Sequence, residues 1–213
     1  MKHFQRIGLM IVGVMAIAAF VGTSAASATT PGKFTATGGK VKLTSSVVTQ
    51  PVISMTGNQF KCNKNEFAGE TTGAEASEQV VTPSFGECTF FGFAVTVETG
   101  TCVLKLTATT DKANGHAEAH LEKCGASGGI TIKIENAFTK CIVHIKEQTF
   151  KGVHYVNNAS PEDIKAQFTV SGIHFETTTS TGLCPLTVGT HTNGTLTGEI
   201  TFQATGGLQY DEL

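Results

Sequence analysis

Histidine and glutamate alternate in one short stretch, His116-Ala117-Glu118-Ala119-His120. On a β-strand, residues two apart share a face, so His116, Glu118 and His120 would lie together and could bind a divalent metal through ring nitrogens and a carboxylate. The glutamate is misplaced for the H-E-x-x-H pattern of metalloproteases. A solvated hairpin face explains the same residues, and we prefer it to a weak metal site. We interpret His144, His154 and His174 in the same way, as surface or hydrogen-bonded histidines.

A second stretch, Gly125-Ala126-Ser127-Gly128-Gly129, matches the G-x-S-x-G pattern of serine hydrolases. That pattern needs a strand before the serine and a helix after it. Here the alternation of Ile130-Thr131-Ile132-Lys133-Ile134 predicts a strand, so we interpret the stretch as a glycine-rich turn.

The nearest acid pairs are Glu118 with Glu122 and Glu162 with Asp163. Nothing around them suggests the separated, differently buried carboxylates of a glycosidase. We therefore assign no catalytic and no cofactor-binding residue, and the sequence favours a non-catalytic protein over an enzyme.

Six cysteines are the remaining reactive side chains: Cys62, Cys88, Cys102, Cys124, Cys141 and Cys184. The gaps between successive cysteines are 26, 14, 22, 17 and 43 residues, which fit no zinc pattern. An even number in an exported chain predicts up to three disulfides.

Six cysteines allow 15 disulfide connectivities. The alternation of side chains between the two faces of a strand favours one of them. In a hairpin that places Leu104 opposite Leu121, the side chains of Cys102 and Cys124 would point to opposite faces. A Cys102–Cys124 bridge would therefore need a bulge. We prefer Cys62–Cys88, Cys124–Cys141 and Cys102–Cys184.

Export is predicted from the N-terminus. Lys2 and Arg6 precede an uncharged apolar run, residues 7–22, and Ala26-Ser27-Ala28 supplies the small residues of a cleavage site. The run of 16 residues is short for a bilayer core of about 30 Å, although a retained anchor is an alternative. We predict a signal peptide over residues 1–28 and one domain over residues 29–213.

Composition then excludes several partners. Without Lys2 and Arg6, 13 basic residues remain against 17 acidic ones, a formal charge of 13 − 17 = −4. Arg6 is the only arginine, and the chain has no tryptophan. Nucleic acids and anionic membranes are therefore not expected partners, because the charge and the guanidinium groups that bind them are missing.

The elements that must position these residues are strands. Threonine and valine suit a pleated surface, glycine supplies turns, and apolar residues alternate with polar ones in several segments: 40–43, 94–98, 130–134, 141–145 and 196–202. About ten short strands predict an all-β fold, an antiparallel β-sandwich or flattened barrel held by disulfides. One helical turn is predicted from Ser160-Pro161-Glu162-Asp163, and a hairpin turn at Asn114-Gly115 argues against two lobes.

Three phenylalanines lie in the stretch Gly86 to Cys102, GECTFFGFAVTVETGTC. A strand in a sheet protein must bury one face, so we interpret Phe90, Phe91 and Phe93 mainly as core residues, with a ligand-gripping lip as the alternative. Phe90 and Phe91 are adjacent and must point to opposite faces. One of them therefore needs a second layer or is exposed.

The chain also resembles a known group. The resemblance rests on Phe34-Thr35-Ala36-Thr37-Gly38-Gly39, Cys88-Thr89 with Phe91-Gly92-Phe93, Cys102, Cys141-Ile142-Val143, Glu147-Gln148-Thr149, Gly172-Ile173-His174-Phe175 and Leu183-Cys184-Pro185. It is to the uncharacterised secreted, cysteine-containing, β-rich proteins of actinobacteria, and it implies export and a β fold. It carries over no site residue.

The sequence thus predicts a secreted or envelope-associated module that binds a cell-surface or extracellular component without catalysis. Two alternatives are a secreted hydrolase whose site forms only in three dimensions, and a histidine-based metal-binding module.

Overall fold

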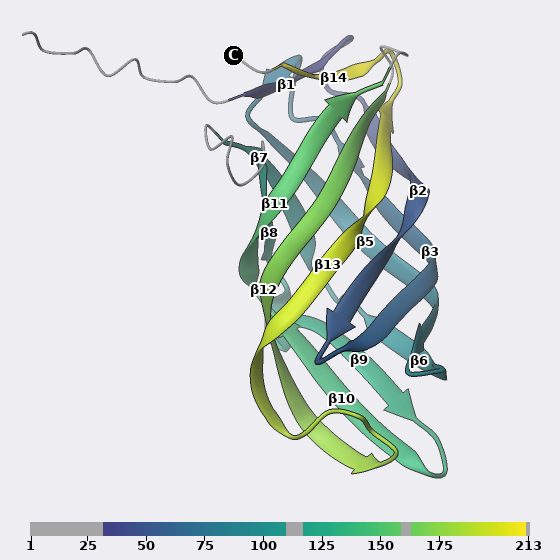
Figure 1. Cartoon of the computed structure of the whole chain (residues 1–213). Coiled ribbons are helices and arrows are strands. Elements are labelled where there is room, and N and C mark those ends of the chain that lie inside the picture. The colour runs from purple at the N-terminus through teal and green to yellow at the C-terminus, as the bar shows by residue number, and fades with distance from the viewer. Residues whose placement is uncertain (1–31, 110–116, 159–162, 212–213) are drawn as a thin grey trace, which may run out of the picture.

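The computed structural model describes residues 32–109, 117–158 and 163–211, and the strands it contains confirm the all-β fold (Figure 1). The predicted signal peptide, its cleavage site, His116, the Asn114-Gly115 turn and Ser160 to Glu162 lie outside these residues. In chain order the strands are β1 (Lys33–Ala36), β2 (Lys42–Met55), β3 (Asn58–Glu70), β4 (Glu75–Ala76), β5 (Glu78–Phe90), β6 (Phe93–Glu98), β7 (Val103–Ala108), β8 (Ala117–Glu122), β9 (Gly129–Glu135), β10 (Thr139–Lys146), β11 (Gln148–Asn157), β12 (Asp163–Gly182), β13 (Gly189–Ala204) and β14 (Leu208–Asp211).

The large sheet is a barrel that closes at two levels. Its antiparallel order is β10-β9-β6-β5-β3-β2-β13-β12-β11-β8-β7, and two further pairings, β5–β7 and β10–β12, join distant strands. Five long strands, β5, β3, β2, β13 and β12, are therefore shared by two rings. Strands β11, β8 and β7 complete the upper ring, and β10, β9 and β6 complete the lower one.

Two of the long strands change partners along their length. Residues 164–168 of β12 pair with β11, whereas residues 176–182 pair with β10. Likewise, residues 78–81 of β5 pair with β7 and residues 88–90 pair with β6. Each ring thus encloses its own core, because the inward side chains of the shared strands meet different partners at the two levels.

The upper core is closed by a small sheet at one end of the barrel. Strand β1 pairs with both β14 and β4, and its Phe34 side chain is buried against Tyr155 and Tyr210, with ring centroids 5.0 and 5.5 Å away. Aromatic pairs at such distances add to the free energy gained from burial. Figure 1 shows β1 and β14 lying across this end.

All three disulfides belong to the lower core: Cys62–Cys88, Cys102–Cys124 and Cys141–Cys184. All six cysteines form disulfides, as predicted. The predicted pair Cys62–Cys88 is also present and joins directly opposed residues of β3 and β5. The predicted pairs Cys124–Cys141 and Cys102–Cys184 are wrong.

The cause of that error is a turn at the end of β8. The predicted ladder is present, with Leu104 opposite Leu121 and Leu106 opposite Ala119. After Glu122, however, Lys123 adopts a left-handed backbone with φ of 57°, and its carbonyl oxygen accepts a hydrogen bond from Thr101 Oγ1 at 2.8 Å. This turn breaks the alternation, so Cys124 faces inward and reaches Cys102.

Backbone bulges explain why long strands were predicted as short ones. In β12 the inward side chains change from even positions, such as Phe168 and Val170, to odd ones, Ile173 and Phe175. The change falls at Gly172, whose φ is 73° and where the register with β13 shifts. Asp163, the described residue of the predicted helical turn, begins this strand instead.

Phe90 and Phe91 do point to opposite faces. Phe90 is 1% exposed in the lower core, and Phe91 is 57% exposed in the tight turn between β5 and β6. Phe91 and Gly92 both have positive φ, 52° and 82°, as a two-residue hairpin turn requires. The predicted core role therefore holds for Phe90 and not for Phe91.

Candidate functional site

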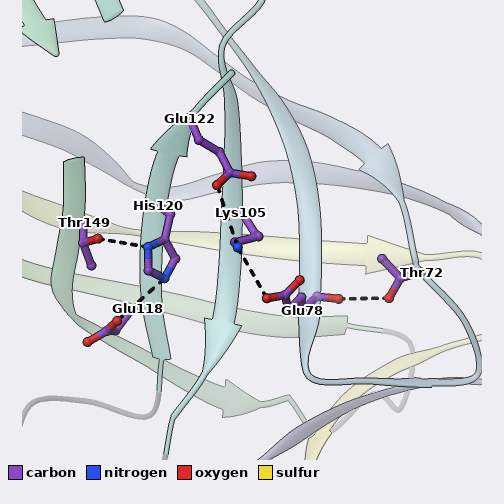
Figure 2. A network of polar contacts seen from close by, with 7 residues as sticks. All are labelled: Thr72, Glu78, Lys105, Glu118, His120, Glu122 and Thr149. Carbon is purple, nitrogen blue, oxygen red and sulfur yellow. Dashed lines mark hydrogen bonds and ion pairs between the residues drawn. The ribbon is translucent and has the colours of Figure 1, made fainter. Parts of the chain in front are cut away.

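Glu118 and His120 lie on the outer face of β8, as the solvated interpretation predicts (Figure 2). His120 Nε2 is 3.7 Å from Glu118 Oε2, and its Nδ1 is 2.9 Å from Thr149 Oγ1. Lys151 Nζ is 3.4 Å from Glu118 Oε1. The Thr149 hydroxyl and the Lys151 ammonium group thus each contact one atom of the two ligand-type side chains, His120 Nδ1 and Glu118 Oε1, while His120 Nε2 and Glu118 Oε2 face each other.

The charges on this face compensate one another. Figure 2 shows Lys105 on β7 between two carboxylates, with Nζ 3.4 Å from Glu78 Oε1 and 3.8 Å from Glu122 Oε2. The described residues contain no group of three side chains suited to a metal ion. Because His116 lies outside them, the weak three-ligand site stays an untested alternative.

The GASGG stretch is a turn, as predicted. Residues Gly125–Ser127 form one turn of 3₁₀ helix, and strand β9 follows directly. The Ser127 hydroxyl lies 2.9 Å from the Cys124 carbonyl oxygen and 3.1 Å from that of Gly129. These contacts hold the turn closed, and a strand stands where a hydrolase would need a helix.

The remaining histidines have local structural contacts. His144 Nδ1 is 3.0 Å from Thr131 Oγ1 on the neighbouring strand, and the backbone of His174 exchanges two hydrogen bonds with the side chain of Gln148. His154 also has a contact within the chain. Sequence reasoning missed His191, whose ring stacks on that of Phe175 with centroids 4.8 Å apart.

A different feature stands out at the end of the barrel away from β1 and β14. Phe138, in the turn between β9 and β10, is 81% exposed, and Leu183 and Val188, in the connection between β12 and β13, are 61% and 63% exposed. We call these three residues the apolar tip. Sequence reasoning missed them, although a phenylalanine placed in a turn between two alternating segments was a visible signal.

Hydrogen bonds and a disulfide hold the backbone at Phe138 and Leu183 of the apolar tip. Thr139 of β10 pairs with Gly182 of β12, which places the Phe138 and Leu183 turns side by side. The Leu183 N–H donates to Thr139 Oγ1 at 3.4 Å, and the Phe138 N–H donates to Asn136 Oδ1 at 2.9 Å. The Cys141–Cys184 disulfide lies directly behind. The Phe138 and Leu183 side chains therefore project from a backbone that these bonds hold in place.

The apolar tip carries no net charge. Residues 136–139 and 182–189 are all uncharged. The nearest charged residues in sequence to the first turn, Glu135 and Lys140, pair with each other at 2.9 Å. The hydrogen bond from Lys140 and its charge lower the pKa of the Glu135 carboxyl, so this pair stays ionised and compensated at neutral pH.

Comparisons with protein-family models, curated proteins and solved structures find no match to this chain. No helix in the described part of the chain has the length and apolar composition needed to cross a bilayer.

Proposed function

We propose that the chain is an exported β-barrel module that acts without catalysis, outside the cell or at its envelope, by attaching to a neutral lipid surface through the apolar tip. Export is supported by the signal-like residues 1–28 and by three disulfides, which are typical of oxidising compartments. The resemblance to secreted actinobacterial proteins agrees with this location.

The observation that carries the proposal is the exposure of Phe138 and Leu183 on two adjoining, uncharged turns. Val188 is exposed at the other end of the same uncharged connection. Exposed apolar clusters mark surfaces that bind. A projecting cluster suits a surface that yields around it, as lipid does, better than a flat protein face. Its neutrality agrees with the lack of the basic residues that anionic lipids attract.

The expected attachment is reversible. Full burial of a Phe, Leu or Val side chain contributes roughly 1.5–3 kcal/mol. Scaled by their exposed fractions, the three side chains together would contribute at most roughly 3–6 kcal/mol. This is no stronger than the reversible attachment given by a single myristoyl chain, whose association constant is about 10⁴ M⁻¹.

Sedimentation with phosphatidylcholine vesicles tests the proposal. The exported protein should bind them equally well when the ionic strength is raised tenfold, because no net charge takes part. The double variant Phe138→Ser/Leu183→Ser should bind at least tenfold more weakly.

Phe91→Ser is the matched control, because Phe91 is an exposed phenylalanine in another turn, and it should bind as the unmodified protein does. The proposal is wrong if the vesicles do not retain the protein, or if retention requires anionic lipid and falls with salt.

A further inference from the structure

A partly enclosed cavity of about 80 Å³ lies between the upper and lower cores. Phe85, Phe150 and Leu196 pack against both cores and also line the cavity, which places it where the two rings meet. Close-packed interiors rarely keep voids larger than a water molecule, whose share of liquid volume is about 30 Å³. The cavity therefore either holds a bound molecule or, when empty, lowers the free energy of unfolding of the protein.

The wall of the cavity is almost wholly apolar. Aliphatic and aromatic side chains and two prolines form it, and among the described residues Asn65 is its one polar member. Asn65 is only 5% exposed, and its amide nitrogen donates to the Cys62 carbonyl oxygen at 2.5 Å. Its Oδ1 is the one side-chain oxygen among the described residues of the wall. Such a wall favours an apolar molecule and disfavours any charged one, because nothing there would compensate a buried charge.

The barrel wall beside the cavity is open in its backbone pairing. Strands β2 and β3 pair at Leu43 with Gly69 and again at Val52 with Lys61, but no ladder pairing joins them in between. Side chains bridge part of this β2–β3 seam. Ser45 Oγ accepts from the Phe67 N–H at 2.8 Å, and Gln50 Nε2 donates to the Cys62 carbonyl oxygen at 2.8 Å.

The seam borders the cavity directly. Pro51 on β2, and Asn65 and Phe67 on β3, belong to the unpaired stretches and also line the cavity. Opening the seam would break side-chain hydrogen bonds and not a backbone ladder, so it costs less than separating two continuously paired strands.

We propose that this cavity is a binding site for a small neutral molecule with an apolar body no larger than a benzene ring, which can carry one hydroxyl group and enters through the β2–β3 seam. The site is distinct from the apolar tip and does not rest on the function proposed above. The hydroxyl would donate its hydrogen bond to Asn65 Oδ1.

Methyl NMR titrations of the exported protein with benzene, phenol and benzoate test this proposal. Benzene and phenol should give saturable shifts at the methyl groups of Leu121, Val170 and Ile173, which line the cavity, and not at those of Ile164 in the upper core. Benzoate should bind at least tenfold more weakly than phenol. Shifts spread over the whole molecule, or equal binding of benzoate, would overturn the proposal.

Two variants separate the contributions of space and polarity. Ala119→Leu fills the cavity, so benzene and phenol should both bind at least tenfold more weakly. Asn65→Leu should weaken phenol severalfold and leave benzene unchanged. Leu183→Ser, at the apolar tip, should bind both probes like the unmodified protein. Unaltered affinities in Ala119→Leu would refute the site. If that variant does not fold, the positions of the shifts in the unmodified protein decide the matter.

The seam has a separate kinetic test. Gln50→Ala removes the hydrogen bond to Cys62, so the exchange rate of bound benzene should rise severalfold while its affinity changes little. An unchanged exchange rate would show that benzene enters elsewhere and would refute the β2–β3 seam as the entrance. Whether the cavity binds benzene at all is tested separately by the methyl shifts.

Discussion

Replacing Ala119 by valine should stabilise the protein, whereas the same replacement at Ala117 should destabilise it. Both alanines lie on β8, face the barrel interior and are almost fully buried, with exposures of 2% and 1%. Of the two, Ala119 lines the cavity. Added carbon atoms at Ala119 enter empty space, whereas at Ala117 they meet packed side chains.

The magnitude follows from the volume. Two additional buried carbons contribute about 1.6 kcal/mol at roughly 0.8 kcal/mol each. Filling all of the 80 Å³ would contribute about 2 kcal/mol at roughly 24 cal/mol per Å³. We therefore expect Ala119→Val to raise the free energy of unfolding by about 1 kcal/mol, after some loss to imperfect fit. Overpacking should make Ala117→Val cost roughly 1–3 kcal/mol.

Guanidinium unfolding followed by far-ultraviolet circular dichroism measures both changes, with the disulfides intact. The midpoints should move in opposite directions at an unchanged denaturant slope. Two variants that lose equal stability would show that Ala119 is as tightly packed as Ala117, and the cavity would not exist in solution. Two variants that gain stability would contradict the packing of the upper core.

Three further predictions concern single side chains. Gln79 is 1% exposed, and neither of its amide atoms has a hydrogen-bond partner in the described chain. Gln79→Met should therefore raise the free energy of unfolding by about 1 kcal/mol in the same assay. A loss of stability would show that the Gln79 amide does have a hydrogen-bond partner in solution. Burial, and secondarily Tyr210, raises the pKa of Tyr155 well above its usual value. The native state therefore holds it neutral, and its stabilising contribution is present below the unfolded pKa of about 10 and is lost as the pH rises above it. Tyr155→Phe should reduce this alkaline loss in pH-dependent unfolding, and an unchanged pH profile would argue against burial. Gly182→Ala should destabilise more than Gly172→Ala, since both have positive φ but only at Gly182 would an added Cβ meet a backbone atom, Phe138 O, at a clashing distance; we expect about 1 kcal/mol for Gly172→Ala from its backbone conformation alone, and equal thermal shifts would contradict the close approach.

The sequence was sufficient for features set by neighbouring residues. Alternation in residues 102–124 predicted the β7–β8 register, and the opposed faces of Phe90 and Phe91 followed from adjacency alone. The sequence was insufficient where a single residue changes which side chains point inward. Lys123 and Gly172 do this through their positive φ. The Cys102–Cys124 bridge and the full length of β12 could therefore not be predicted from alternation.

The closure of the barrel and its cavity were also beyond prediction. Periodicity shows which face of a strand is buried, but not which distant strands it pairs with, and β12 pairs with β13 and with both β11 and β10. The cavity depends on side chains from many strands, with Ala119 small where larger residues were equally compatible with the pattern. The apolar tip differs, because the sequence alone places Phe138 in a turn between two alternating segments, where its side chain is expected to be exposed.

Backbone amide hydrogen exchange across the two closing pairs tests the two-level barrel most directly. The β5–β7 pair, around Gln79 and Leu106, and the β10–β12 pair, around Cys141 and Ser180, should both be protected to a degree comparable with the central β12–β13 pair. Rapid exchange at both closing pairs, beside slow exchange in β12–β13, would mean that the sheet is open and that neither enclosed core exists as described.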